Sequence, residues 1–269
     1  MTRTRLALGV EYDGSGFHGW QSQSGSTNVQ DAVNRALSRV ADEDVRCMGA
    51  GRTDAGVHAI EQIAHFETSA RRSRRDWLFG ANTYLPDDVN LLWVREVPGD
   101  FHARHSALSR TYVYLILNRS VRSALERNRA WLIRDPLDDE AMDRAAQALA
   151  GAHDYSSFRA ADCQARSPVR RVMDIRVRRS GQRVCITCRA NGFLQRMVRN
   201  IAGSLALVGR DRKATAWIGE ILEARSREAA GPAAPPQGLY LQQIGYPPDL
   251  LPEQNPAGLE TFLPVQKDI

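Results

Sequence analysis

Lysine is almost absent from this sequence of 269 residues: Lys213 and Lys267 are the only two. Since Lys and Arg together number 36, the other 36 − 2 = 34 basic residues are arginines. The 31 acidic residues leave a formal net charge of +5. Arginine pairs bidentately with phosphate groups and stacks on bases. This composition favours a polyanionic partner such as nucleic acid, although a general bias towards arginine is the alternative.

Long apolar runs are also missing. The sequence has no stretch of about 18 apolar residues, which excludes a transmembrane helix. Residues 1–8 contain no apolar segment of signal-peptide length, so we expect a cytoplasmic protein. Apolar residues make up 43% of the chain and charged residues 25%, proportions that are typical of globular proteins. The length fits one large domain or two modest ones.

Cysteine is scarce, with Cys47, Cys163, Cys185 and Cys188 as the four examples. The last two form a C-x-x-C pattern inside a predicted strand. Residues three apart on a strand point to opposite faces, so this pair is badly placed for a metal or a disulfide. A second C-x-x-C, which a zinc site would need, is absent. We expect buried thiols in a reducing compartment.

The sequence motifs of several enzyme classes are absent as well. There is no G-x-S-x-G, Walker A or H-E-x-x-H pattern. His102 and His105 have a spacing that suits a metal, but no third ligand accompanies them. No second carboxylate is paired with Asp54 nearby in the sequence, which argues against a two-carboxylate hydrolase. We expect neither a metal nor a cofactor.

The first half of the chain predicts a ferredoxin-like unit. Val29, Val33 and Leu37 recur at helical spacing, and Thr27 with Gln30 predicts a capping box at the start of that helix. The order of elements is βαββαβ. The predicted strands are 6–12, 45–49, 62–68 and 90–97, and the predicted helices are 29–40 and a second one around 77–81.

The second half predicts a similar order, βαββααβ, with 229–238 as a linker-like stretch rich in Pro, Ala and Gly. We therefore predict an α+β protein in which two ferredoxin-like or RRM-like halves form an extended, mainly antiparallel sheet. Helices flank this sheet, and a cleft lies at its centre. The predicted domains are 1–104, 105–246 and a peripheral tail at 247–269. The predicted strands of the second half are 111–117, 172–177, 184–190 and 239–246, and the helices are 141–149, 193–208 and 217–224.

Gly14, Gly16 and Gly19 form a G-x-G-x-x-G pattern directly after the first strand. In a dinucleotide site a helix begins at this point, so that its amides face the pyrophosphate. Here the next helix is predicted only near Asn28. We therefore expect a tight loop in which another segment approaches the backbone closely, and a dinucleotide-dependent oxidoreductase is the weaker alternative.

Chemistry-bearing residues are densest in the segment GAGRTDAGVH, residues 49–58. Glycines let the backbone turn sharply there and let a ligand come close. The segment displays one carboxylate, Asp54, at its apex, with Arg52 beside it. The alternative is that Asp54 only forms an Asx-turn with its own backbone.

Arginines gather in three further places: 71–75, 166–171 and 176–179. Each cluster alone is typical of a solvated face, but together they favour a surface that binds a nucleic-acid backbone. On the helix over 193–208, Arg199 lies off the apolar stripe. It is available as a cation that would hold a facing carboxylate ionised.

These motifs together resemble one family, the tRNA pseudouridine synthases of the TruA type. The resemblance runs from about residue 6 to residue 246, and it is specific because the order and spacing of many short motifs agree. The matching stretches are GVEYDG (9–14), FHGWQ (17–21), AGRTDAGVH (50–58), FHAR (101–104), SRTY (109–112), DYSSFR (154–159), MVRNI (197–201) and GLYL (238–241).

The resemblance implies a function and a set of residue roles. Asp54 matches the catalytic nucleophile, with Arg52 in the same motif. Tyr112 matches a contact of the target base, Arg199 the partner of the aspartate, and Leu239 a wall of the uracil pocket. Family members isomerise uridine at positions 38, 39 and 40 of the tRNA anticodon stem-loop, without cofactor or metal, as homodimers.

A non-catalytic RNA-binding module is the main alternative from another class. RRM sheets share the ferredoxin-like topology, and basic loops would suit RNA. However, the sequence lacks the RNP-type aromatic pattern of such modules, and a pure binder has no use for Asp54 where RNA phosphates approach.

Overall fold

The protein is described by a computed structural model that covers residues 3–251. These residues form two compact units. The first comprises 3–108 and 241–251, and the second comprises 109–240. The first unit therefore extends beyond 104 and includes the end of the last strand. Most of the predicted tail, 247–269, lies outside the described residues.

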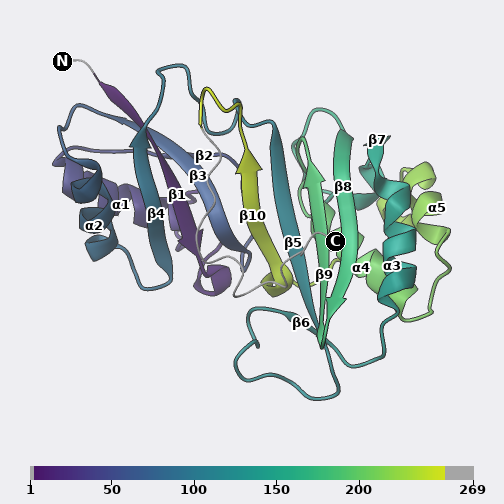
Figure 1. Cartoon of the computed structure of the whole chain (residues 1–269). Helices are drawn as coiled ribbons and strands as arrows, with labels where there is room; N and C mark the ends of the chain where they lie inside the picture. The colour runs from purple at the N-terminus through teal and green to yellow at the C-terminus, as the bar shows by residue number, and fades with distance from the viewer. Residues whose placement is uncertain (1–2, 252–269) are drawn as a thin grey trace. The chain divides into compact units, whose positions relative to one another are not determined.

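Three antiparallel strands form the sheet of the first unit in the order β4-β1-β3 (Figure 1). In the register of β1 with β3, Leu6 lies opposite Phe66 and Leu8 opposite Ala64, and all four are at most 4% exposed. These alternate residues form the face of the sheet that is buried against helices. The strands are β1 (Thr4–Tyr12), β3 (His58–Thr68), β4 (Val89–Glu96) and the short β2 (Met48–Gly49), which pairs with β3.

Two helices, α1 (Val29–Ala41) and α2 (Arg74–Tyr84), cover that face of the first unit. Trp77 of α2 packs edge-on against Phe66, with ring centroids 5.1 Å apart. The predicted capping box of α1 is wrong by one position, because Asn28 is the N-cap and its side chain accepts from the amide of Asp31. A capping box does begin α2, formed by Ser73 and Asp76.

The second unit has a sheet of its own strands in the order β5-β9-β8-β7, all antiparallel, with a short β6 parallel to β5. Gly181, at a φ of +57°, makes the turn between β8 and β9. The strands are β5 (Ser109–Asn118), β6 (Trp131–Ile133), β7 (Gly151–Asp154), β8 (Val169–Ser180) and β9 (Arg183–Ala190). A last strand, β10 (Leu239–Gly245), begins in the second unit and continues in the first.

The helices of the second unit are α3 (Asp139–Ala146), α4 (Met197–Gly209) and α5 (Trp217–Ala224). α4 is buried almost all round, which fits its apolar sequence. It begins at Met197, later than predicted. The segment 229–238 is not a linker: a Cβ on Gly203 of α4 would lie 1.8 Å from the carbonyl oxygen of Pro232, and Ala234 is only 1% exposed.

The predicted α+β class with mainly antiparallel strands is confirmed. The first unit has the predicted βαββαβ order, whereas the second has two strands, β6 and β7, that the sequence did not predict. All four cysteines are free and buried. Among residues 3–251, no helix is long and apolar enough to span a bilayer.

Candidate active site

Asp54 lies on the loop 50–57, which joins β2 to β3 in the first unit. The loop turns between Asp54 and Val57, where the Val57 amide donates to the Asp54 carbonyl at 3.2 Å. Gly56 occupies this turn at a φ of +75°, a conformation that favours glycine. Both predicted residues lie on this one loop, where Asp54 is half-buried and Arg52 is exposed.

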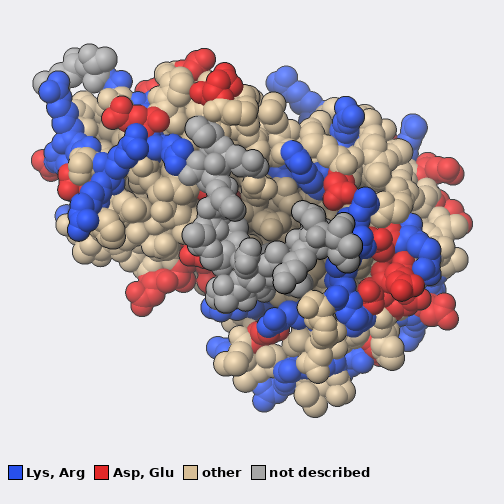
Figure 2. All heavy atoms as spheres, viewed as in Figure 1, with Lys and Arg blue, Asp and Glu red and all other residues tan. Residues whose placement is uncertain are grey.

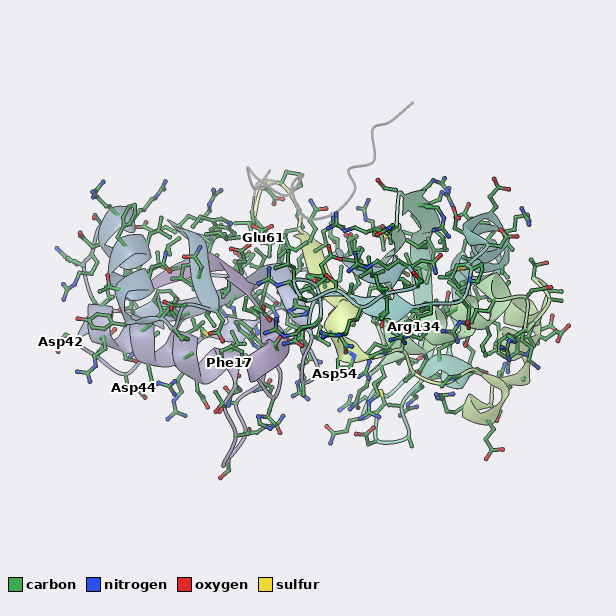
Figure 3. All side chains as sticks on the ribbon, turned by 90° about the horizontal axis from the view of Figure 1, so that it is seen from below. Phe17, Asp42, Asp44, Asp54, Glu61 and Arg134 are labelled. Atoms are coloured by element: carbon green, nitrogen blue, oxygen red, sulfur yellow. The ribbon has the colours of Figure 1, made fainter. Side chains whose placement is uncertain are left out.

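The loop 50–57 is pressed against the segment that follows β1. The amide of Trp20 donates to the Thr53 carbonyl, and the amide of Gly56 donates to the Phe17 carbonyl, both at 3.2 Å. Figure 3 shows Asp54 and Phe17 towards one side of the view and Glu61 towards the other. The segment with the G-x-G-x-x-G pattern therefore lies next to the loop that carries Asp54.

The G-x-G-x-x-G pattern is explained by this contact. A Cβ on Gly14 would lie 1.9 Å from the Val57 carbonyl oxygen, and one on Gly19 would lie 2.3 Å from that of Thr53. Gly14–Gly16 forms only a short 3-10 turn, and the next helix begins at Val29. No helix N-terminus is available there for a pyrophosphate. The close-approach interpretation is confirmed, and the dinucleotide alternative is wrong.

Buried polar side chains hold the loop 50–57 from the sheet side. The Tyr12 hydroxyl contacts Thr53 Oγ1 at 2.8 Å, and both residues are at most 6% exposed. The Gln62 carboxamide accepts from the Gly51 amide at 3.2 Å and donates to the Gly51 carbonyl at 2.7 Å. No sequence motif pointed to Tyr12 or Gln62 as supports of this loop. The one indication for Gln62 was a polar residue in register with the apolar face of β3.

His58, the last residue of the motif, begins β3 and is 2% exposed. Its Nδ1 accepts from the amide of Gly14 at 3.0 Å and lies 3.2 Å from Asp13 Oδ1. An Nδ1 that accepts an amide hydrogen leaves the ring proton of a neutral histidine on Nε2. His58 therefore fastens the start of β3 to the segment after β1.

Tyr112, Arg199 and Leu239 all belong to the second unit. Tyr112 is on β5, 8% exposed, with its ring at right angles to that of Phe193 at 5.1 Å. Tyr114 follows on the same face of β5, and its hydroxyl donates to the Pro235 carbonyl at 2.7 Å. Burial raises the pKa of Tyr114, and the nearby Arg199 guanidinium opposes this rise.

Arg199 is fixed to the segment before β10. Its Nε donates to the Ala234 carbonyl at 2.8 Å, and its own carbonyl accepts from the Ala234 amide at 2.9 Å. Further along, a Cβ on Gly238 would lie 2.7 Å from the Tyr114 ring, so this segment packs tightly on β5 just before Leu239. The structure thus brings Arg199, Tyr114 and the segment 234–239 together. The pairing of Arg199 with Asp54 stays a prediction.

The arginine clusters are not alike. In the cluster 176–179, Arg178 pairs with Asp143 at 3.1 Å and Arg179 with Asp139 at 2.6 Å, both partners on α3. Figure 2 shows basic and acidic side chains intermingled at the right of the view, where α3 and β8 lie. These two arginines join β8 to α3, and their role in binding phosphate stays a prediction. Arg171, in the cluster 166–171, is exposed.

Three histidine rings lie in a row in the first unit. His102 is 4.7 Å from His65 and 4.3 Å from His105, measured between ring centroids. Burial, with the neighbouring His102 and Arg5, lowers the pKa of His65 to about 4. The Ala103 amide donates to His65 Nδ1, so this ring nitrogen is not available to a metal. Within the described part of the chain, no group of three side chains is arranged to hold a metal.

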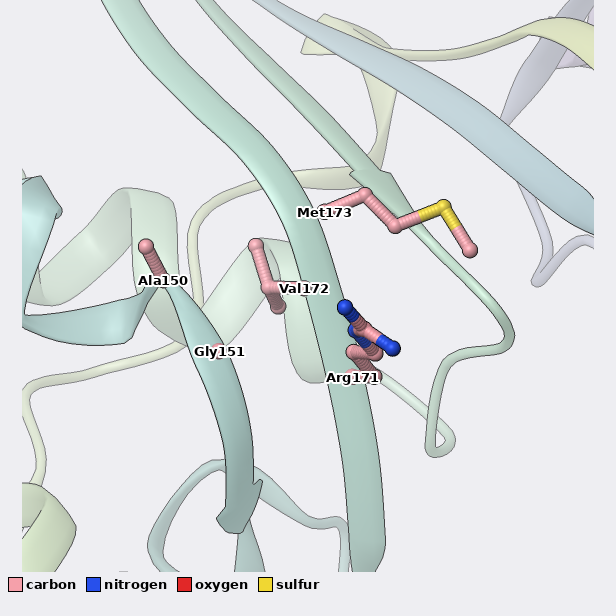
Figure 4. A pocket seen from close by; sticks show the side chains of 5 residues that line it. All are labelled: Ala150, Gly151, Arg171, Val172 and Met173. Atoms are coloured by element: carbon pink, nitrogen blue, oxygen red, sulfur yellow. The ribbon is translucent and has the colours of Figure 1, made fainter.

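A shallow hollow lies between β7 and β8 in the second unit. Figure 4 shows that Ala150, Gly151, Arg171, Val172 and Met173 line it. Arg171 is its one ionisable side chain, and no carboxylate or histidine faces it. It therefore offers none of the groups that acid–base or nucleophilic chemistry requires.

Comparison with known proteins agrees with the motif order. A sequence profile described as "tRNA pseudouridine synthase" matches residues 9–106 and 145–247. Proteins named tRNA pseudouridine synthase A from Methylococcus capsulatus and Pseudoalteromonas atlantica are 58% and 50% identical over 243 residues, which is 90% of this chain and 90% and 92% of theirs. One from Coxiella burnetii is 48% identical over 261 residues, covering 97% of this chain and 99% of its own.

Proposed function

The chain belongs to the tRNA pseudouridine synthase family, and from this premise we propose that it isomerises uridine at positions 38, 39 and 40 of the tRNA anticodon stem-loop, with Asp54 as the nucleophile. The family assignment makes it an isomerase that acts on tRNA. One observation supports the assignment of Asp54. Its half-buried carboxylate lies on a loop that the segment after β1 holds on one side and the side chains of Tyr12 and Gln62 hold on the other.

The reaction is an isomerisation that needs neither a redox partner nor an energy donor. The C1′–N1 bond of uridine breaks and a C1′–C5 bond forms, while C5 loses a proton and N1 gains one. The ionised carboxylate of Asp54 attacks C1′ or C6, or assists by removing a proton from the ribose. All three routes require an anion that is fixed in position beside the nucleotide.

The other predicted residues take supporting roles in this proposal. Arg199 pairs with the Asp54 carboxylate and orients it. Tyr112 contacts the target base, Leu239 forms an apolar wall of the uracil pocket, and Arg52 binds substrate next to Asp54. The uridine must be unstacked before it reaches these groups, at a cost of a few kcal/mol, and contacts with the RNA backbone offset that cost. Recognition rests mainly on RNA shape.

The tRNA positions can be tested with stem-loop and full-length transcripts. In each RNA one uridine is kept at 38, 39, 40 or a control position in the loop, and pseudouridine is mapped after incubation with the protein. We expect product at 38, 39 and 40 alone. Product at the control position, or at none of the three, would contradict the proposed specificity.

The role of Arg199 has a separate test. We expect Arg199→Ala to lower turnover far more than tRNA affinity, because its charge acts on the carboxylate and not on phosphate. Equal losses in turnover and affinity would make Arg199 a phosphate contact instead.

We also propose that the protein acts as a homodimer in the cytoplasm, and sedimentation of the purified chain at micromolar concentration tests its oligomeric state.

A further inference from the structure

The loop 50–57 closes one turn with its own backbone, through the bond from the Val57 amide to the Asp54 carbonyl. The ladder between β2 and β3 ends just before the loop: Gly49 pairs with Ala64, and the Ala50 amide donates to the Ile63 carbonyl at 2.8 Å. Neighbouring elements hold the rest of the loop: backbone bonds with Trp20 and Phe17 flank Asp54, and a side chain of β3 holds the start of the loop.

Gln62 of β3 supplies the next step of that ladder. Its Oε1 accepts from the Gly51 amide and its Nε2 donates to the Gly51 carbonyl, so one side chain satisfies both backbone groups of Gly51. A carboxamide carries a donor and an acceptor on one planar group, which is what a neighbouring strand would offer. The side chain therefore extends the pairing by one residue after the backbone has turned away.

Gln62 is also fully buried, with 0% of its surface exposed. Its side chain lies on the helix-covered face of β3, in register with Ala64 and Phe66. A buried carboxamide that lost these partners would leave unsatisfied polar groups, which is costly. Breaking the bonds between Gln62 and Gly51 is therefore unfavourable at this buried position. The hydrogen bond between the Tyr12 and Thr53 hydroxyls supports the loop two residues further along.

We propose that Gln62 is a positioning residue for the reaction. Its two hydrogen bonds to Gly51 set the orientation of the loop, and this orientation directs Asp54 towards the nucleotide. This inference rests on the proposed role of Asp54. Loss of these hydrogen bonds displaces the Asp54 carboxylate from its attacking position without removing any group that contacts RNA. A misplacement of about 1 Å at a reacting group can cost on the order of 100-fold in rate.

The test is the single-turnover rate of pseudouridine formation, measured beside the Kd for the same tRNA. For Gln62→Ala we expect a rate about 10- to 100-fold lower and an unchanged Kd. Thr68→Val is the matched control, because Thr68 is a 1% exposed residue on the same strand whose hydroxyl bonds Glu43, away from the loop. It should be destabilised similarly and keep the wild-type rate. A folded Gln62→Ala with the wild-type rate would overturn the proposal.

Gln62→Glu provides a second measurement, which decides the matter if Gln62→Ala does not fold. A protonated carboxyl group can donate to the Gly51 carbonyl as the amide does, whereas a carboxylate cannot. The rate of this variant relative to wild type should therefore fall as the pH rises and the carboxyl ionises. A relative rate that does not depend on pH would contradict the positioning role.

Asp54→Ala in the same assay separates the two proposals. If Asp54→Ala keeps the wild-type rate, the proposed function of Asp54 fails, whatever Gln62 does. If Asp54→Ala is inactive and Gln62→Ala is as fast as wild type, only the positioning role of Gln62 fails.

Discussion

At the level of single residues, glycine positions record how closely two segments of the first unit approach. Gly14 and Gly19 lack the space for a Cβ because carbonyl groups of the loop 50–57 lie against them. Gly25, between them and α1, has no atom within 4 Å of a Cβ position, and its φ is positive like that of Gly19. Gly19 and Gly25 therefore share a left-handed backbone and differ in whether a Cβ would meet a neighbour.

This difference gives the first prediction. Gly25→Ala should lower the free energy of unfolding by about 1–2 kcal/mol through its left-handed backbone alone. Gly19→Ala should cost about 1–3 kcal/mol more, because the new methyl group overlaps the Thr53 carbonyl, and it should slow pseudouridine formation by shifting the loop. Urea unfolding and a turnover assay measure both effects. Equal losses in the two variants would refute the close contact.

His65 gives a prediction about pH. Its pKa is lowered to about 4 by burial and by the neighbouring His102 and Arg5. The unfolded chain binds this proton near pH 6.5 and the native protein only near pH 4, so stability is lost as the pH falls through that window. Between pH 7.5 and pH 5 we expect this residue to account for a loss of about 1–2 kcal/mol.

His65→Gln should remove that part of the pH dependence. The free energy of unfolding of wild type minus that of the variant, followed by urea titration from pH 7.5 to pH 5, should decline as the pH falls. Glu61, whose pKa is raised by burial, contributes in the opposite direction, and the comparison of the two proteins cancels it. A constant difference would show that His65 is not held neutral.

At the level of elements, the start of α1 provides the clearest test. Asn28, which is 1% exposed, caps the helix, whereas the sequence pattern favoured Thr27. Asn28→Ala should therefore lower stability by about 1 kcal/mol, and Thr27→Ala by less than about 0.5 kcal/mol. Thermal unfolding of the two variants distinguishes the cap positions, and the reverse order would contradict the structure.

The predicted elements were those with a strong periodic pattern. The helix over Val29–Ala41 buries helically spaced apolar residues, and the strands β5 and β9 bury runs of consecutive apolar residues, which a sequence shows directly. The short β6 and β7 have too few residues for such a pattern. The segment 229–238 has the composition of a linker but packs on α4, because Gly203 admits its backbone. Such a contact depends on tertiary structure and has no local pattern.

The candidate site divides in the same way. The loop around Asp54 was predicted because its glycines and charged residues are contiguous in the sequence. Gln62 and Tyr12 were missed because their importance lies in bonds to Gly51 and Thr53, which the sequence alone does not reveal. The cluster 176–179 was predicted as part of a phosphate-binding surface because its arginines are close in sequence. The ion pairs of Arg178 and Arg179 with carboxylates of α3 were missed because these partners are distant in sequence.

For the whole molecule, an excess of arginine predicts that tRNA affinity depends steeply on salt. The logarithm of the association constant should fall linearly with that of the salt concentration, by about 0.7–0.9 for each phosphate contacted. Arg171→Ala should weaken binding and reduce this slope by about one contact. Arg179→Ala, which loses the pair with Asp139, should leave the slope unchanged. Equal slopes for wild type and Arg171→Ala would exclude Arg171 from the interface.

Asp54 is the proposed nucleophile of the isomerisation, so its removal should abolish the reaction. Pseudouridine formation expels the hydrogen on C5, so tRNA with tritium at C5 of its uridines reports the reaction directly. We predict release of tritium by the wild-type protein and none by Asp54→Ala, which should bind the tRNA as tightly as wild type. Release by both proteins would contradict the role of Asp54, and release by neither would contradict the proposed reaction.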